Sequence, residues 1–253
     1  MPSVVLEVRN LSKRFGGLTA VSGLDFDVRE GEILGVIGPN GAGKSTTFNI
    51  IAGAYPASGG DVRFAGESIL GLPPHKIAAR GVMRTFQHNR PFAGMSVADN
   101  VLVGAHTRFG FNVFGKKSLL DEKANRARAE ELMEFVGLGE LRQADVATLS
   151  FGQGRLLEIA RGLAGEPRLM LFDEPAAGLT PAELTRVSGV IRGIAERGIA
   201  VLLIEHDMHF LLPLAHRVVV LNFGAKIADG LPEEVRSNPA VTDAYLGSHA
   251  AAR

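Results

Sequence analysis

The sequence contains no cysteine, no net charge and no apolar run long enough to cross a membrane. The absence of cysteine excludes disulfides and thiolate metal sites, and it fits a reducing compartment. The 27 basic and 27 acidic residues give a formal net charge of +0, so no overall positive field favours nucleic acid as a partner. The longest apolar runs, such as residues 199–204, have only the length of a strand. Residues 1–9 show no signal-peptide pattern, so we expect any role at a membrane to be peripheral.

What is present indicates a folded α/β chain. Hydrophobic residues make up 46% of the 253 residues, and the mean hydropathy is +0.15. Residues 4–9 and 24–28 alternate apolar and polar side chains, which predicts half-buried antiparallel strands. Residues 33–37, 169–172 and 200–204 are almost wholly apolar, as in strands covered on both faces. Because such strands alternate with helical patterns, we expect a parallel sheet with right-handed crossovers.

Helical patterns dominate between these strand-rich parts, from about residue 97 to residue 164. Within this stretch, residues 121–136 are rich in charge on one side, which is typical of a helix face exposed to solvent. The opposite, core-facing side is predicted to carry Ala124, Ala127, Leu132, Phe135 and Val136. We interpret the whole stretch as a helical lobe inserted into the sheet domain.

The most specific motif is Gly38-Pro39-Asn40-Gly41-Ala42-Gly43-Lys44-Ser45, between an apolar strand and the start of a helix at Thr46. Its glycines let successive backbone N–H groups point at phosphate oxygens, and the helix N-terminus adds a partial positive charge. Lys44 is predicted to reach the β- and γ-phosphates, and the Ser45 hydroxyl to bind magnesium. A chance glycine-rich turn is the alternative, with a frequency on the order of one per cent in a chain of this length.

A second motif, Leu169-Met170-Leu171-Phe172-Asp173-Glu174, is an apolar strand that ends in two acids. At the carboxyl end of a buried parallel strand, such acids face the ligand crevice. Asp173 can hold magnesium through water, and Glu174 can polarise a water toward the γ-phosphate. A strand that simply ends in a charged turn is equally common, but the phosphate loop favours the chemical interpretation.

Three further features are ambiguous when each is taken alone. Leu149-Ser150-Phe151-Gly152-Gln153 opens a predicted helix, where an ordinary N-cap is favoured over a second phosphate-binding helix end. Gln87 ends a predicted strand and His206 follows another, so each could lie beside a γ-phosphate, although both residue types are also common in turns. Glu205, His206 and Asp207 with His209 lack a complete metal-ligand spacing.

Taken in order, these motifs resemble the nucleotide-binding subunits of ABC transporters over essentially the whole chain. Four segments sharpen the resemblance to LivG-type ATPases, which energise uptake of branched-chain amino acids and related solutes. They are Arg84-Thr85-Phe86-Gln87-His88, Leu149-Ser150-Phe151-Gly152-Gln153, Ile204-Glu205-His206-Asp207-Met208 and Ala244-Tyr245-Leu246-Gly247.

The resemblance implies a P-loop NTPase (RecA-like) α/β fold: a parallel-sheet core, an antiparallel β subdomain and an inserted α-helical subdomain. Residues 1–253 would form one ATPase domain, with the β subdomain and core in 1–90 and 165–253 and the helical lobe in about 91–164. It implies ATP and Mg²⁺ as cofactors and a peripheral position on the cytoplasmic face of the inner or plasma membrane. The implied partners are transmembrane permease subunits, an identical or LivF-like second ATP-binding subunit and, indirectly, a periplasmic or extracellular solute-binding protein. Nucleic acid is not an implied partner.

The family mechanism places ATP between the phosphate loop of one subunit and the signature helix of the other, in a head-to-tail dimer. By resemblance, Glu174 is the general base, Lys44 and His206 hold the γ-phosphate, and Gln87 senses magnesium and the attacking water. The magnesium ligands implied are Ser45, Gln87 and Asp173. The nucleotide-binding residues implied are Phe15, stacked on adenine, Val21, beside the sugar or base, and Gly38, Pro39, Asn40, Gly41, Ala42, Gly43, Lys44, Ser45, Thr46, Ser150, Gly152 and Gln153.

The chain departs from the family pattern at a few positions. Thr180 stands where the family usually has Asp or Asn, and Gly154 and Leu156 replace a polar and a basic residue after Gln153. The Phe109-Gly110-Phe111-Asn112-Val113-Phe114-Gly115-Lys116-Lys117 stretch either contacts a membrane partner or tucks its rings under the helical lobe.

Three alternative functions can be weighed. A lipid or lipopolysaccharide export ATPase shares the Tyr-Leu-Gly tail but differs at Leu149–Gln153 and Ile204–Met208. A soluble ABC ATPase acting on DNA or ribosomes would carry a tandem ATPase, a coiled-coil or zinc insertion, or a basic extension, and none is seen. A non-hydrolysing regulatory module is disfavoured by the intact Lys44, Asp173, Glu174 and His206.

Overall fold

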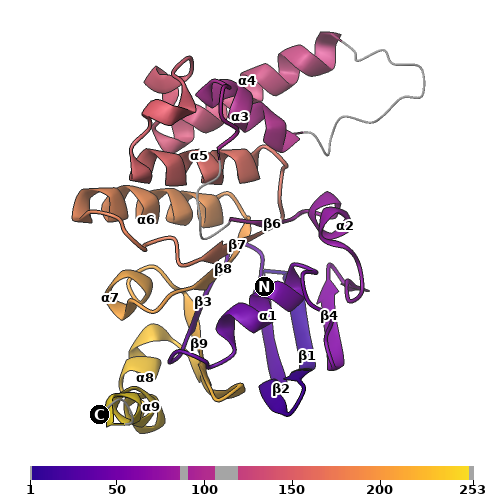
Figure 1. The fold of residues 1–253 in the computed structure, drawn as a ribbon, viewed down its shortest axis with the longest axis vertical. Coiled ribbons are helices and arrows are strands. Elements are labelled where there is room, and N and C mark those ends of the chain that lie inside the picture. The colour runs from indigo at the N-terminus through magenta and orange to yellow at the C-terminus, as the bar shows by residue number, and fades with distance from the viewer. Residues whose placement is uncertain (1, 86–90, 106–118, 251–253) are drawn as a thin grey trace.

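The computed structural model of the chain describes residues 2–85, 91–105 and 119–250 (Figure 1). Gln87 and the 109–117 stretch lie outside the described residues. Two sheets and a group of helices make up the described part, which confirms the predicted fold class.

The larger sheet has six strands in the order β10-β9-β3-β8-β7-β6. All neighbours from β9 to β6 are parallel, and β10 runs antiparallel to β9 at one edge. The strands are β3 (Ile33–Ile37), β6 (Val82–Arg84), β7 (Leu169–Asp173), β8 (Ala200–Ile204), β9 (Arg217–Asn222) and β10 (Ala225–Gly230). The carboxyl ends of β3, β8 and β7 therefore lie next to one another, which is where α/β sheets bind ligands.

The smaller sheet is antiparallel, in the order β2-β1-β4-β5. Its strands are β1 (Val4–Phe15), β2 (Leu18–Arg29), β4 (Gly59–Phe64) and β5 (Glu67–Ser68). β1 and β2 are each longer than the alternating patterns of residues 4–9 and 24–28. The patterns end early because register shifts interrupt the β1–β2 pairing beyond Val8. A bulge puts two residues of one strand opposite one of its partner, so it breaks the simple alternation that a sequence pattern detects.

Helices cover both faces of the parallel sheet. They are α1 (Lys44–Ile51), α2 (Pro74–Ala79), α3 (Val97–Gly104), α4 (Leu119–Val136), α5 (Phe151–Leu163), α6 (Pro181–Glu196), α7 (Met208–Leu211), α8 (Pro232–Arg236) and α9 (Pro239–Ala250). Two short 3₁₀ turns, η2 (Gly139–Leu141) and η3 (Val146–Thr148), join α4 to α5. α7 and α8 are short, with four and five residues.

The two faces of the parallel sheet belong to separate hydrophobic cores. In β3, Ile33 and Ile37 pack with helices α3 to α6, whereas Leu34 and Val36 pack with α1 and the antiparallel sheet. This alternation follows from the period of two in a strand. As a result, α1 and α5 lie on opposite sides of the sheet (Figure 1).

The core-facing side of α4 differs from the prediction. Leu132 and Val136 are buried as expected, but Ala124 and Ala127 are exposed. The buried side instead consists of Asn125, Ala129, Leu132, Met133 and Val136. These positions recur at the three- and four-residue spacing of one helix face, with the adjacent Leu132 and Met133 both inside it, whereas Ala124 and Ala127 fall on the opposite side.

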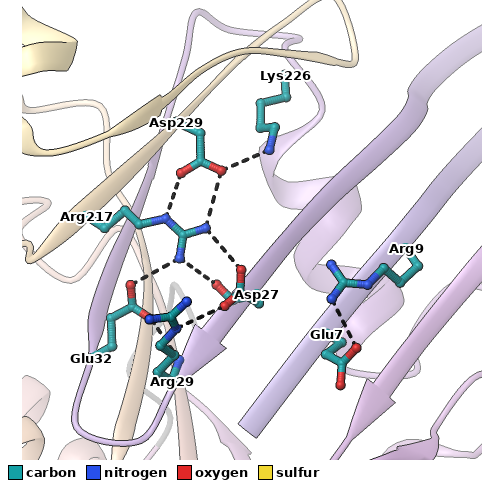
Figure 2. A network of polar contacts seen from close by, with 8 residues as sticks. All are labelled: Glu7, Arg9, Asp27, Arg29, Glu32, Arg217, Lys226 and Asp229. Carbon is teal, nitrogen blue, oxygen red and sulfur yellow. Dashed lines mark hydrogen bonds and ion pairs between the residues drawn. The ribbon is translucent and has the colours of Figure 1, made fainter. Parts of the chain in front are cut away.

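A network of charged side chains joins the two sheets (Figure 2). Arg217 of β9 donates to Asp229 of β10 at 2.7 Å and to Glu32 and the Asp27 carboxylate at 3.2 and 3.3 Å. Lys226 donates to the second oxygen of Asp229 at 2.9 Å. Because Asp27 lies on β2, Arg217 ties the antiparallel sheet to the edge of the parallel one.

Candidate nucleotide-binding site

The phosphate loop runs from the end of β3 to the start of α1. Gly38 has a φ of 153° and Gly43, the N-cap of α1, has a φ of 99°. A Cβ at Gly38 would collide with the Leu221 carbonyl, and a Cβ at Gly43 with the Ala20 carbonyl. Both positions therefore require glycine for backbone angle and for space. The amide of Ala42 donates to the Pro39 carbonyl at 3.1 Å, which closes the turn.

Lys44 is the charged centre of this loop. Its Nζ donates to the carbonyls of Gly38 at 2.6 Å and Pro39 at 3.0 Å, so the ammonium is held inside the loop. The side chain is buried, and burial lowers the pKa of Lys44 while the charges of Glu174 and Asp173 raise it. The loop lysine and the two acids at the carboxyl end of β7 therefore face the same space. Ser45 is exposed and Thr46 half-buried on the first turn of α1.

Asp173 is the last residue of β7 and is almost fully buried. Its Oδ2 accepts a hydrogen bond from Arg84 Nη2 at 2.7 Å, and Arg84 Nη1 donates to Asn49 Oδ1 at 2.6 Å. Burying a carboxylate without such a partner is energetically costly. Arg84 therefore connects Asp173 to α1, the helix that follows the phosphate loop.

Glu174 and His206 lie side by side at the ends of β7 and β8. The amide of Glu174 donates to the Ile204 carbonyl at 3.0 Å, and Glu174 Oε1 lies 3.8 Å from His206 Nδ1. Glu174 has a φ of 49°, an unusual angle for a residue with a side chain. Such strain is concentrated at functional sites, where the surrounding structure holds it in place.

Glu205 is a buried carboxylate next to this pair. Its Oε1 accepts from the Ala176 amide at 2.8 Å, and its Oε2 lies 3.8 Å from His206 Nδ1. Burial raises the pKa of Glu205, although backbone N–H groups of Ala176, His206 and Asp207 oppose that shift. His206 Nδ1 thus lies between two carboxylates, one partly exposed and one fully buried.

Phe15 and Val21 belong to the antiparallel sheet. Phe15 is 43% exposed at the β1–β2 turn, and its ring meets Tyr55 edge-on with centroids 5.7 Å apart. Lys13 Nζ lies 4.8 Å from the Phe15 ring centroid. Because the ring is partly exposed, a base could stack on it. Val21 is fully buried beside Gly43, so its side chain supports the phosphate loop.

The segment Ser150–Gln153 lies at the start of α5 and on the far side of the sheet from α1. Ser150 is the N-cap: its Oγ accepts from the Gln153 amide at 3.2 Å, and Gln153 Oε1 accepts from the Ser150 amide at 2.8 Å. The ordinary N-cap role is therefore confirmed. The packing of α1 and α5 in separate cores keeps this segment apart from the phosphate loop within one chain.

Four polar residues of this region were given no individual role from the sequence: Arg84, Asn49, Glu205 and Glu183. Glu183 accepts a hydrogen bond from the Gly152 amide at the start of α5. Glu205 had a usable signal, because an acid directly after an apolar strand is the same pattern that identified Asp173. Arg84 and Glu183 find their partners 89 and 31 residues away, so no local pattern points to them.

Two negative findings concern only the described ranges. No three His, Asp or Glu side chains there are grouped as a metal site, which leaves the cluster at Glu205–His209 without support. No helix there combines the length and the apolar character that a bilayer span needs.

The phosphate loop lies between β3 and α1, and the two acids at the carboxyl end of β7 face it. This arrangement defines a P-loop nucleotide-binding protein. The ABC transporter family model matches residues 21–177, and a branched-chain amino acid ATP-binding cassette transporter model matches residues 225–251. The chain belongs to the ABC transporter family of ATP-binding proteins, and it is an ATPase.

Relatives match along nearly the full length. The high-affinity branched-chain amino acid transport ATP-binding protein BraF of Pseudomonas aeruginosa is 44% identical over 255 residues, covering 98% of this chain and 99% of the relative. The corresponding LivG of Salmonella typhimurium is 41% identical with the same coverage. A crystal structure of the ADP conformation of an ATP-binding cassette of an ABC transporter has a TM-score of 0.85 at 31% identity. It covers 97% of this chain, and this chain covers 99% of it.

Proposed function

We propose that this ATPase is the nucleotide-binding subunit of an ABC importer for branched-chain amino acids or closely related solutes. The likeness to BraF and LivG over 98% of the chain supports the solute class. The match of residues 225–251 to the branched-chain model favours import over lipopolysaccharide export. The chain acts at the cytoplasmic face of the membrane, bound to separate permease subunits that receive solute from a binding protein.

One observation carries the mechanism: the phosphate loop and the N-terminus of α5 are on opposite sides of one sheet. Each is built as an anion-binding element, yet one chain cannot bring both to the same phosphate. Two subunits related head to tail solve this problem, because each supplies the phosphate loop of one site and the α5 N-terminus of the other. ATP then joins the subunits, and its hydrolysis releases them. We infer that residues 1–253 act as one ATPase unit, with the helical lobe of about 91–164 carrying Ser150–Gln153.

The phosphate loop holds the nucleotide in this proposal. Lys44 leaves the carbonyls of Gly38 and Pro39 and donates to the β- and γ-phosphates, a stronger, charge-assisted interaction. The backbone from Gly38 to Thr46 surrounds the phosphates, and the open ring of Phe15 stacks on adenine. From the partner subunit, the hydroxyl and amide groups at Ser150, Gly152 and Gln153 complete the γ-phosphate site.

Oxygen donors suit magnesium, and the residues present fit it. The exposed Ser45 hydroxyl and the Asp173 carboxylate, oriented by Arg84, would hold the ion together with Gln87. When bound, the ion neutralises charge that builds up on the phosphate oxygens during transfer. Glu174 takes a proton from the attacking water, and His206, 3.8 Å away, holds the water and the γ-phosphate in line.

Replacing Glu174 by Gln tests this assignment. We expect ATP binding to persist, turnover to fall by about 10²–10⁴-fold, and an ATP-bound dimer to accumulate. Sedimentation with ATP and a phosphate-release assay measure both effects. Normal turnover in this variant would show that Glu174 is not the base. Copurification from native membranes then identifies the permease and any second ATP-binding subunit, and recovery without a permease contradicts the importer assignment.

A further inference from the structure

The carboxylate of Glu183 joins the N-termini of two helices, α6 and α5. Glu183 is the third residue of α6, and its partners on α5 are 31 and 33 residues earlier in the chain. The two carboxylate oxygens have different partners. One oxygen accepts hydrogen bonds at the N-terminus of α6, the helix that carries Glu183. The other accepts hydrogen bonds from the segment Ser150–Gln153 at the start of α5.

Oxygen Oε2 completes an ordinary capping box. It accepts from the Thr180 amide at 2.9 Å and from Thr180 Oγ1 at 2.9 Å, while Thr180 caps α6. These bonds, together with those from Gly152 and Ser150, lower the pKa of Glu183, so the carboxylate is ionised at neutral pH. Thr180, the unusual residue in the loop before α6, is therefore the anchor of Glu183.

Oxygen Oε1 lies at the start of α5. It accepts from the Gly152 amide at 3.2 Å and from Ser150 Oγ at 3.4 Å. A Cβ on Gly152 would collide with the same carboxylate, so only glycine lets it approach. An anion is thus already held by the two groups that the proposed function assigns to the γ-phosphate of the partner subunit's ATP.

We propose that Glu183 is a positioning residue that fills this anion site in the single subunit and is replaced there by the γ-phosphate when the dimer closes. The inference rests on the proposed head-to-tail dimer, since the phosphate comes from a second subunit. The Gly152 amide and the Ser150 hydroxyl have one hydrogen each, so neither can serve the carboxylate and the phosphate fully at once. The Glu183 carboxylate and a γ-phosphate bound to the same two donors would also repel each other.

The exchange requires only a local movement. Oε2 can stay bound to Thr180 while the carboxylate turns away from Gly152, so α6 keeps its cap. Until then, Glu183 holds the Ser150 hydroxyl and the Gly152 amide in the direction in which a phosphate needs them. Competition for these donors raises the ATP concentration at which subunits associate, and it leaves the affinity of the phosphate loop for ATP unchanged.

Replacing Glu183 by Gln in the full chain that also carries Glu174→Gln tests the competition. Gln keeps the capping box but removes the charge. Association is measured with the ATP-binding subunit that copurifies or with a second copy of the chain. We expect the ATP concentration for half-maximal association to fall by about 3- to 10-fold, the net worth of one ordinary hydrogen bond. Sedimentation measures association, and a fluorescent ATP analogue measures binding to the single subunit. Glu196→Gln, an exposed acid at the other end of α6, is the matched control and changes neither.

Glu183→Asp provides a second variant, because its shorter carboxylate keeps the charge but does not reach Gly152. We expect it to lower the required ATP concentration as well. In a chain with Glu174 intact, we expect it to lower the KM for ATP without lowering kcat. An unchanged or raised ATP requirement in both variants, with normal thermal unfolding, overturns the competition and leaves Glu183 as a helix cap. If the parent Glu174→Gln chain does not associate with ATP at all, the head-to-tail dimer fails instead.

Discussion

Arg84 donates from Nη2 to Asp173 Oδ2 at 2.7 Å, with only 18% and 7% of the two side chains exposed. The pair links β6, a three-residue edge strand, to the acidic end of β7. Because Arg84 occupies Oδ2, it fixes the orientation of the carboxylate that would hold magnesium in the proposed site. The same guanidinium binds Asn49 on α1, so one side chain aligns the acid with the helix that carries Ser45.

Replacing Arg84 by Met should therefore harm both stability and metal-dependent binding. Breaking a largely buried pair by removing one partner costs about 2–4 kcal/mol of unfolding free energy. ATP affinity should fall more in the presence of Mg²⁺ than with a chelator, because Asp173 loses its orientation. Urea unfolding and nucleotide titration measure the two effects. Arg80→Met, which removes an exposed pair with Glu67 at 3.5 Å, should cost less than about 1 kcal/mol. Equal losses of affinity with and without Mg²⁺ would assign Arg84 a purely structural role.

Glu205→Gln should stabilise the protein at high pH and have no such effect in acid. Burial raises the pKa of Glu205, so the folded chain holds this proton more tightly than the unfolded chain. Stability then falls as pH rises from about 4, the ordinary glutamate value, through the folded pKa. Gln is neutral throughout and can still accept from Ala176. The Tm difference between variant and parent should grow from pH 4 to pH 8. A difference that does not depend on pH would contradict the buried, protonatable carboxylate.

Asp229→Asn should have the opposite pH dependence. Burial alone would raise the pKa of Asp229, but the bonds from Arg217 and Lys226 outweigh it and lower the pKa. The stability that this carboxylate contributes is present above about pH 4 and is lost as pH falls through the lowered folded value. We expect the variant to lose about 1–2 kcal/mol of unfolding free energy at pH 7 and progressively less in acid. Arg9→Met removes the separate, exposed pair with Glu7 in Figure 2 and should cost less than about 1 kcal/mol at either pH.

The parts of the site that could be predicted are formed by residues that are consecutive in the sequence. The phosphate loop needs glycine at Gly38 and Gly43 for local backbone reasons, so its sequence reveals it directly. Asp173 and Glu174 stand at the carboxyl end of the apolar strand β7. The parallel order β3-β8-β7 places this end at the same edge of the sheet as the phosphate loop. The alternation of strand and helix patterns predicted the parallel sheet, and the family resemblance implied the full P-loop NTPase fold.

The parts that could not be predicted depend on contacts between distant segments. Ser150 was recognised as a cap, but nothing in the sequence places the Glu183 carboxylate against it. Ala124 and Ala127 looked like core residues because alanine is small and apolar, whereas the fold turns Asn125 and Ala129 inward. The segment that contains Gln87 lies outside the described residues, and its role stays a prediction.

The strand order also governs when the site can form during synthesis. β3, which leads into the phosphate loop, pairs only with β8 and β9 among the described strands. Both neighbours are encoded more than 160 residues later, at residues 200–204 and 217–222. A nascent chain therefore carries its nucleotide loop on an unpaired apolar strand until most of the protein has left the ribosome. The phosphate loop is thus translated early but gains its structure late, and we expect a chain truncated before β9 to bind ATP weakly, because β3 then lacks one of its two neighbours.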